Sequence, residues 1–332
     1  MAQKLYICAC PPASPAESRF FWRKKGVEGM SLGKDLLALE TLSAEDIYLI
    51  LKRADKYRHR LDHGDKAGKE LRGWTVANLF FEPSTRTRMS FELAAQYLGA
   101  HVINFSDLGS SLAKGESILD TAWTIEAMAV DCLVIRHGTS GMVKQVAENV
   151  RAAVVNAGEG RHEHPTQGLL DLLTIWRHKG RIRGLKVVIV GDVLHSRVAR
   201  SNIQGLTKLG AQVVVSGPAT LMPDGADWPV EIETDLDKAL RGADCVNVLR
   251  IQRERQEQGL FPSLKEYFHF WGIDQNRLDK NILLLHPGPM NRGVEISDRA
   301  ADGPNSAVLD QVTNGVAVRM AVLSLLKEGS GR

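Results

Sequence analysis

The residues Ser84-Thr85-Arg86-Thr87-Arg88 form a dense cluster of anion-binding side chains. They follow an apolar run and precede a helical pattern, which places them at the first turn of a helix. The free backbone N–H groups of that turn carry a partial positive charge, and the hydroxyl groups and the Arg86 guanidinium add donors. This combination suits a tetrahedral dianion such as a phosphate group. The alternative is an ordinary capped helix with exposed basic residues, and the Gly-x4-Gly-Lys spacing of a P-loop is absent.

Further polar clusters come directly after other apolar runs of the chain. They are Arg136-His137, His164, Gly191–Arg197, Arg250–Gln252 and Pro287–Pro289. In parallel α/β sheets, ligands bind beyond the carboxyl ends of the strands. The repeated placement of polar residues at such ends favours one shared binding site over scattered surface polarity.

The body of the chain alternates helical and strand patterns, which is typical of α/β folds with parallel sheets. Strands are predicted at 74–81, 101–105, 131–136, 153–156, 186–190, 212–216, 245–249 and 282–285. Helices are predicted at 43–61, 87–98, 118–128, 165–178, 197–209, 236–240 and 306–327, and the helix at 165–178 is predicted to be amphipathic and to bridge the two halves. The segment 252–280 begins as a charged, irregular stretch and is predicted to be a mobile loop. We therefore predict two doubly wound parallel-sheet domains that are joined by interdomain helices, with the C-terminal helix packing back on the N-terminal domain.

Length and charge narrow the classes of function. A chain of 332 residues with 44% hydrophobic and 24% charged residues predicts two globular domains. Residues 1–29, predicted as a flexible extension, carry five basic and two acidic side chains and so hold the whole net charge of +3. The neutral remainder argues against nucleic acid as a partner. No apolar run reaches the about 18 residues of a membrane span, and the sparse cysteines indicate reduced thiols in the cytoplasm.

The segment Phe81–Arg88 resembles the carbamoyl phosphate signature of the aspartate and ornithine carbamoyltransferases. The match continues in order along the chain through Lys114-Gly115-Glu116-Ser117, Arg136-His137, His164-Pro165-Thr166-Gln167, Gly191-Asp192, His195-Ser196-Arg197, Arg250-Ile251-Gln252 and His286-Pro287-Gly288-Pro289. This resemblance covers about residues 31–328. It implies a carbamoyl phosphate-binding domain over 30–165 with the helix 306–328, and an aspartate-binding domain over 166–305.

The acceptor follows from the later motifs. The ornithine branch usually carries a His-Cys-Leu-Pro and a Ser-Met-Gly segment, whereas this chain has His286–Pro289 without cysteine and no Ser-Met-Gly. Its Arg-x-Gln and Pro-x-Pro segments resemble the aspartate branch, and Arg250 would repel the cationic side chain of ornithine. The resemblance therefore implies transfer of the carbamoyl group of carbamoyl phosphate to the amino group of L-aspartate. The products would be N-carbamoyl-L-aspartate and phosphate, in the second step of de novo pyrimidine (UMP) biosynthesis.

The resemblance also implies which residues contact carbamoyl phosphate. Contacts with the phosphate group are implied for Ser84, Thr85, Arg86 and Thr87. Negative charge builds on the carbonyl oxygen as the amine attacks, and this oxygen would face Thr87, Arg136 and His164. Gln167 would orient the carbamoyl NH2 group. Whether His164 is the general base or the departing phosphate takes the proton stays open.

Aspartate contacts are implied for Lys114, Arg197, Arg250 and Gln252, and backbone contacts with both substrates for Gly288 and Pro289. In the family, the loop that carries Lys114 enters the active site of the neighbouring subunit. The resemblance therefore implies a homotrimer in which Ser110 and Lys114 reach an adjacent site, with Ser110 or Ser111 as the serine that makes the contact. The sequence leaves open whether regulatory or dihydroorotase chains join the trimer.

No metal and no cofactor are expected. His-Glu-x-x-His and paired-cysteine motifs are absent, and the segment Gly191–His195 lacks the Gly-x-Gly-x-x-Gly pattern of a nicotinamide site. Two alternatives remain, a carbamoyltransferase for another amino acid and a catalytically silent scaffold subunit of a pyrimidine-pathway complex. The second is disfavoured because the chain keeps Arg86, Lys114, Arg136, His164, Arg197 and Arg250.

Overall fold

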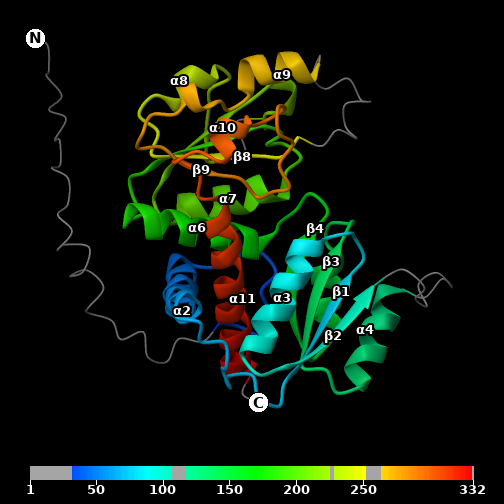
Figure 1. The fold of residues 1–332 in the computed structure, drawn as a ribbon. Helices are drawn as coiled ribbons and strands as arrows, with labels where there is room; N and C mark the ends of the chain where they lie inside the picture. Colours follow the sequence, from blue (N-terminus) through cyan, green and yellow to red (C-terminus); the bar gives the residue numbers. More distant parts are fainter. Residues whose placement is uncertain (1–31, 107–116, 225–227, 252–262, 331–332) are drawn as a thin grey trace, which may run out of the picture. The chain divides into compact units, whose positions relative to one another are not determined.

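The computed structural model describes residues 32–106, 117–224, 228–251 and 263–330. The predicted extension 1–29 lies outside them, as do Ser110, Ser111, Lys114 and Gln252. The described residues contain two parallel β-sheets with helices packed against them (Figure 1). The predicted α/β class with two doubly wound sheets is therefore confirmed.

The first sheet has the strand order β2-β1-β3-β4, and all of its strands are parallel. Its strands are β1 (Thr75–Phe80), β2 (His101–Ser106), β3 (Cys132–His137) and β4 (Ala153–Glu159). Alternate residues of β1 face opposite sides, as the two-residue period of a strand requires. Val76 packs in the core cluster that includes α3 (Thr85–Tyr97), whereas Ala77 packs with α4 (Ile118–Ala127) and α5 (Met142–Asn149).

The second sheet has the strand order β7-β6-β5-β8-β9 and is also parallel throughout. Its strands are β5 (Lys186–Val190), β6 (Gln212–Ser216), β7 (Glu231–Ile232), β8 (Cys245–Val248) and β9 (Leu283–Leu285). The short helices α8 (Leu236–Leu240) and α10 (Asp298–Ala301) share one core cluster with alternate residues of these strands. The other face belongs to the large cluster that also contains residues of the first sheet.

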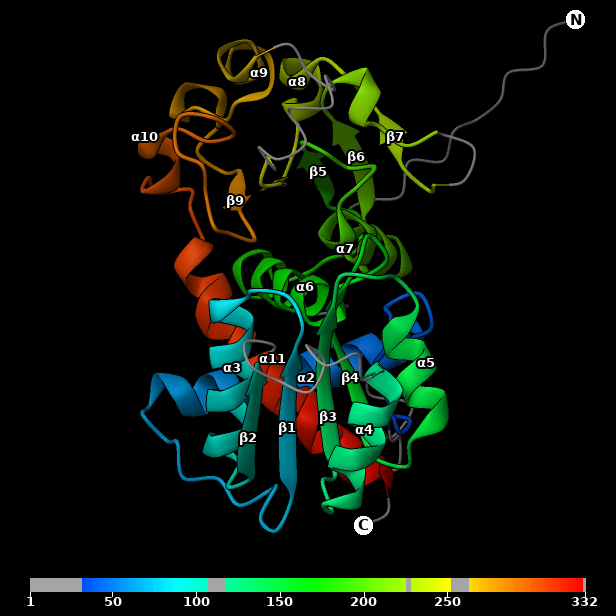
Figure 2. The same cartoon turned by 90° about the vertical axis from the view of Figure 1, so that its right-hand side faces the viewer.

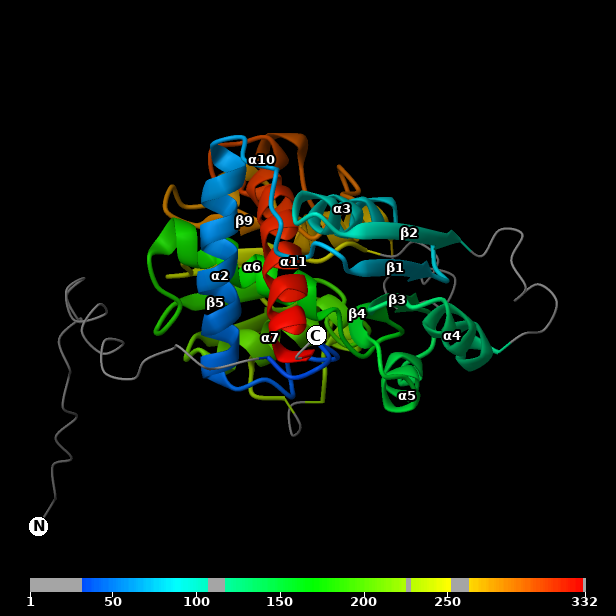
Figure 3. The ribbon, with the colours of Figure 1, turned by 90° about the horizontal axis from the view of Figure 1, so that it is seen from below.

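Four helices connect the two sheets through this large cluster (Figures 2 and 3). They are α2 (Ala44–Asp62), α6 (Pro165–Lys179), α7 (Arg197–Lys208) and α11 (Val308–Ser330). The last of them, α11, packs against α2, α3 and α6. The C-terminal helix thus returns to the helices of the first sheet, as the sequence predicts.

The local sequence explains where the first of these helices begins. Ser43 accepts a hydrogen bond from the Asp46 backbone N–H, and the Asp46 side chain accepts one from the Ser43 backbone N–H, which forms a capping box. The predicted apolar face is buried, with Ile47, Leu51 and Ala54 fully inaccessible. Burial of this face anchors α2 against α11.

Two expectations differ from the structure. The sequence predicts an amphipathic α6, but every residue from Pro165 to Ile175 is buried, because the helix lies inside the shared core. The segment 252–280 was expected to be a loop, but its described part contains the helix α9 (Leu264–Trp271). Ser263 caps that helix by accepting from the Glu266 backbone N–H, and Tyr267 anchors it in the core.

Within the described ranges, no helix combines the length and the apolar character that crossing a bilayer requires. The cysteines of these ranges, Cys132 and Cys245, are buried free thiols. Cys8 and Cys10 lie outside the described residues.

Candidate active site

The predicted site residues lie at the topological switch points of the two sheets. In the first sheet the strand order reverses between β1 and β3. Ser84 follows β1, and Arg136 lies near the end of β3. In the second sheet the strand order reverses between β5 and β8. Arg197 follows β5, and Arg250 follows β8. Switch points leave a crevice beyond the strand ends, which is where ligands bind in open α/β sheets.

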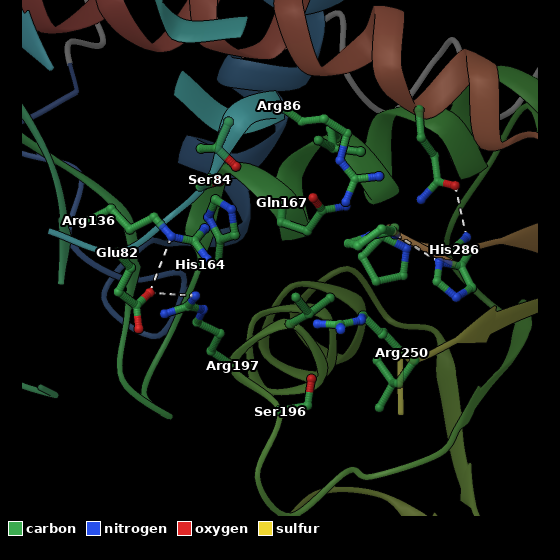
Figure 4. A pocket seen from close by; sticks show the side chains of 18 of the residues that line it. Glu82, Ser84, Arg86, Arg136, His164, Gln167, Ser196, Arg197, Arg250 and His286 are labelled. Atoms are coloured by element: carbon green, nitrogen blue, oxygen red, sulfur yellow. Dashed lines mark hydrogen bonds and ion pairs between the residues drawn. The ribbon is translucent and has the colours of Figure 1, made fainter. Parts of the chain in front are cut away.

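These residues line one cavity of about 1000 Å3 (Figure 4). The wall includes the predicted residues Ser84, Thr85, Arg86, Thr87, Arg136, His164, Gln167, Arg197, Arg250, Gly288 and Pro289. It contains six arginines but only two carboxylates among the described residues. The excess of positive charge makes the cavity a site for anionic ligands.

The hydrogen-bond donors that suit a phosphate group lie at the start of α3. Ser84 is the N-cap residue of this helix, but its hydroxyl makes no capping hydrogen bond and so stays available to a ligand. The first turn of α3 contains no acidic side chain that would compete for its backbone N–H groups. The geometry therefore supports the anion site that the sequence predicts at Ser84–Thr87.

The Arg86 guanidinium lies against the turn after β9. A side chain at Gly288 would collide with the Arg86 guanidinium, because a Cβ atom there would overlap Nη1. Gly288 also has a φ of +61°, which favours glycine, and it is joined to Pro289 by a cis peptide bond. Burial in the cavity wall, and then the charge of Arg250, lower the pKa of Arg86.

Glu82 joins the arginines of the two sheets, and the sequence analysis assigned it no role. Its Oε2 atom lies 3.2 Å from Arg136 Nε and accepts a hydrogen bond of 3.0 Å from Arg197 Nη2 (Figure 4). Gly158, with a φ of +115°, admits both guanidinium groups, since a Cβ atom there would lie 3.3 Å from Arg197 and 3.4 Å from Arg136. The signal for Glu82 was its place in Phe81–Arg88, two residues before Ser84.

His164 is held as a neutral imidazole beside these arginines. Its pKa lies well below the ordinary value because of burial, and then because of the charges of Arg136, Arg197 and Arg319. Its backbone N–H donates to Ser201 Oγ at 2.9 Å, while its buried Nδ1 has no hydrogen-bond partner within the described residues. A neutral imidazole in this position is a weak base but a suitable hydrogen-bonding partner for a substrate.

The guanidinium group of Arg136 is the most perturbed of the predicted cations. Burial, followed by the charge of Arg197, lowers its pKa to about 10, although Glu82 opposes this shift. Arg136 therefore stays charged near neutral pH, and its charged group lies largely shielded from water. Such a group stabilises developing negative charge more strongly than an exposed arginine does.

A second buried network holds the turn at His286–Pro289. His286 Nδ1 accepts a hydrogen bond of 2.8 Å from the Gly288 backbone N–H, and His286 Nε2 lies 3.2 Å from Glu295 Oε1. Since Nδ1 is the acceptor, Nε2 carries the proton and donates to the carboxylate. His286 therefore has a structural role in this turn.

A cluster outside the cavity has the composition of a metal site. Ligand atoms of Glu40, His162 and Glu163 lie within 4.8 Å of one another. The Glu163 oxygens, however, already accept hydrogen bonds from two backbone N–H groups and from Ser201 Oγ. We assign this cluster a structural role because its buried carboxylate is satisfied by the protein itself.

Comparison with known families identifies the family to which the fold belongs. Residues 34–177 match the carbamoyl-P binding domain of the aspartate/ornithine carbamoyltransferases, and residues 183–326 match the Asp/Orn binding domain. The chain belongs to the aspartate/ornithine carbamoyltransferase family. The resemblance that the motifs indicate is thus confirmed over nearly all of the described residues.

Among curated members of this family, similar chains are aspartate carbamoyltransferase catalytic subunits. The protein of Halothermothrix orenii is 54% identical over 297 residues, which cover 88% of this chain and 95% of the relative. The protein of Desulforamulus reducens is 53% identical over 313 residues, which cover 93% and 97%. The activity that these relatives share is that of an aspartate carbamoyltransferase.

Solved structures of the carbamoyltransferase family share the fold. Ornithine carbamoyltransferase from Pyrococcus furiosus has a TM-score of 0.81 at 34% identity and covers 90% of this chain and 99% of its own. The catalytic subunit of aspartate transcarbamoylase from M. jannaschii has a TM-score of 0.79 at 33% identity and covers 90% and 100%. Aspartate transcarbamoylase from Trypanosoma cruzi, solved with N-(phosphonacetyl)-L-aspartic acid, has a TM-score of 0.79 at 30% identity and covers 88% and 95%. The fold is therefore common to both acceptor branches, and the acceptor must be argued from individual residues.

Proposed function

We propose that this chain transfers the carbamoyl group of carbamoyl phosphate to the amino group of L-aspartate, as an aspartate carbamoyltransferase does. The observation that carries the proposal is the single cavity in which the anion site at Ser84–Thr87 faces Arg197 and Arg250. A phosphate and a dicarboxylate need separate sets of cations, and the two sheets each supply one. Relatives about 53% identical over most of the chain carry the same name, which supports the acceptor.

The carbamoyl phosphate site would use both the start of α3 and the end of β3. Ser84, Thr85, Arg86 and Thr87 would hold the phosphate group, and the Gly288 and Pro289 carbonyl groups would accept from substrate N–H groups. Arg136, His164 and Thr87 would surround the carbonyl oxygen. Preorganised donors at that oxygen lower the barrier because negative charge grows there as the amine attacks.

The proton of the attacking amine would go to the departing phosphate rather than to His164. The lowered pKa of His164, caused mainly by its burial, makes the imidazole a poor base near neutral pH. A phosphate group that gains charge as the carbamoyl bond breaks is a better acceptor, and the reaction itself brings it next to the amine. His164 would then serve as a hydrogen-bond donor to the carbonyl oxygen.

The proposal extends to a homotrimer in the cytoplasm, in which Ser110 or Ser111 and Lys114 complete a neighbouring site. This extension rests on the family resemblance of the Lys114–Ser117 motif, which begins outside the described residues. The domain assignment is part of the same proposal, with 30–165 and 306–328 binding carbamoyl phosphate and 166–305 binding aspartate. Gln252, also outside the described residues, would join Arg250 at the β-carboxylate of aspartate. The pathway would be de novo pyrimidine biosynthesis.

Replacing Arg250 by alanine should raise the KM for aspartate by at least about 100-fold, because a charge-assisted contact with a carboxylate contributes about 1.5–3 kcal/mol and Arg250 can make two. Purified protein is assayed for carbamoyl-aspartate over a range of aspartate concentrations, with ornithine in parallel. The KM for carbamoyl phosphate should change only a few-fold.

The matched control is Arg241→Ala, which removes an exposed arginine after α8 without altering the cavity. Its kinetics should equal those of the unmodified chain. Unchanged aspartate kinetics in the Arg250→Ala variant would contradict the assignment of Arg250 to the aspartate site. Turnover of ornithine in place of aspartate by the unmodified chain would contradict the proposed acceptor.

A further inference from the structure

Asp171 lies fully buried behind the cavity and binds four side-chain amides. Its Oδ1 accepts from Gln167 Nε2 at 3.0 Å and from Gln311 Nε2 at 2.7 Å. Its Oδ2 accepts from Asn202 Nδ2 at 2.7 Å and from Asn247 Nδ2 at 3.1 Å. All four donors are uncharged amides, so within the described residues the hydrogen bonds to the Asp171 side chain come from neutral groups, an arrangement that a buried carboxylate seldom adopts.

The four amides come from four elements, α6, α7, β8 and α11, and the first three of these adjoin predicted substrate-binding residues. Gln167 and Asp171 belong to α6, which begins after His164, and Asn202 belongs to α7, which begins at Arg197. Asn247 lies on β8, three residues before Arg250. Gln311 on α11 also accepts from the His286 backbone N–H through Oε1 at 2.9 Å, which extends the network to the turn that contains Gly288.

The carboxylate determines which end of the Gln167 amide faces the cavity. An ionised carboxylate only accepts hydrogen bonds, so the amide must turn its NH2 group towards Asp171. Gln167 lines the cavity (Figure 4), whereas Asp171 is not among the lining residues. The remaining polar atom of the amide, the carbonyl Oε1, is therefore the one that a ligand can meet.

We propose that Asp171 is a positioning residue that fixes the Gln167 amide with its carbonyl oxygen towards the substrate, so that the site selects a donor N–H group on the transferred acyl unit. This inference rests on the proposed function. Carbamoyl phosphate has an NH2 group at that position, whereas acetyl phosphate has a methyl group with the same phosphate and carbonyl. Asp171 thereby acts on substrate choice through Gln167.

Asp171→Asn tests the inference because it keeps the volume but removes one acceptor. An asparagine offers one carbonyl oxygen and brings an NH2 group of its own, so the surrounding amides cannot all be satisfied. The Gln167 amide is then free to turn its carbonyl inward. Affinities for carbamoyl phosphate and for acetyl phosphate are measured by calorimetry, and the ratio between them is compared.

In the unmodified chain the ratio should favour carbamoyl phosphate, and Asp171→Asn should reduce this preference by about tenfold, the value of one neutral hydrogen bond. The reduction should come from weaker binding of carbamoyl phosphate, with acetyl phosphate nearly unchanged. Equal losses for both ligands would show a merely structural role and would overturn the inference.

Thr174→Val is the matched control for general damage between α6 and α11. Thr174 is buried one turn after Asp171, and its Oγ1 accepts from Asn314 Nδ2 of α11 at 2.8 Å, but it does not line the cavity. The variant should lose thermal stability while keeping the preference for carbamoyl phosphate. A changed preference in this control would also count against a specific role of Asp171.

The pH dependence of the unmodified chain gives a second measurement that needs no variant. Burial raises the pKa of Asp171 to about 6, and the groups hydrogen-bonded to it from α6, α7, β8 and α11 are all uncharged amides. Protonation below this pKa gives the carboxyl group a donor, so the preference for carbamoyl phosphate should fall between about pH 7.5 and 5. Titration of the two ligand phosphates cancels in the ratio.

These outcomes also separate the inference from the proposed function. If the unmodified chain binds neither phosphate compound, the proposed function fails. If it binds both and prefers carbamoyl phosphate, but the preference is insensitive to Asp171→Asn and to pH, only the role of Asp171 fails.

Discussion

Replacing Arg136 by alanine should lower kcat by about 100- to 1000-fold, the loss that follows removal of one preorganised donor to a developing oxyanion. The guanidinium is positioned by Glu82 and partly desolvated, with a pKa lowered to about 10 mainly by burial. Its charge therefore acts where water competes little. Steady-state kinetics with both substrates varied should place most of the loss in kcat, because the charge on the carbonyl oxygen is greatest in the transition state.

The same pKa sets a direction for the effect of pH. A guanidinium with a pKa near 10 loses its charge as pH rises through that value, so kcat of the unmodified chain should decline above about pH 9. Arg181→Ala, which removes an exposed arginine away from the cavity, is the control for loss of one positive charge. If Arg136→Ala changed only the KM values, the assignment of Arg136 to the carbonyl oxygen would be wrong.

Arg86→Ala should weaken carbamoyl phosphate binding by at least about 100-fold, since two charge-assisted hydrogen bonds of about 1.5–3 kcal/mol each are removed. The absence of a side chain at Gly288 leaves room for the Arg86 guanidinium in the cavity wall. The dissociation constant is measured by calorimetry without aspartate. Near-normal affinity would contradict the phosphate assignment.

The Arg86→Ala chain also tests the proposed sharing of sites. Mixed trimers are prepared from inactive Arg86→Ala chains and inactive Lys114→Ala chains. Some interfaces then combine an intact Arg86 with an intact Lys114 from the neighbour, so part of the activity should return. The absence of recovery in trimers whose mixed composition has been verified would argue against shared sites.

The sequence predicts the architecture well because the strands and the positions of the site residues both follow local patterns. Buried apolar runs fix the parallel strands, and polar residues directly after them fall at one edge of each sheet. Ser84, Arg136, Arg197 and Arg250 could therefore be assigned to a common cavity before any coordinates. What the pattern could not give is the strand order, which decides that Ser84 and Arg136 flank the same switch point.

The residues that the sequence analysis missed act through long-range contacts. Glu82 contacts arginines that follow it by 54 and 115 positions, so its role depends on tertiary structure. Asp171 reads as a polar residue in a helix that was expected to be amphipathic, and only the burial of α6 on all sides reveals its four amide partners. Local periodicity carries no information on contacts of this kind.

The proposed activity requires one cavity to neutralise a phosphate and a dicarboxylate at the same time. The direct test is the affinity for N-(phosphonacetyl)-L-aspartate, which joins both anions in one molecule, against phosphonoacetate and succinate measured separately by calorimetry. N-(phosphonacetyl)-L-aspartate should bind at least about 1000-fold tighter than the better single anion, because linking two occupied sites gains effective concentration. An affinity no greater than that of the better single anion would contradict the proposed activity.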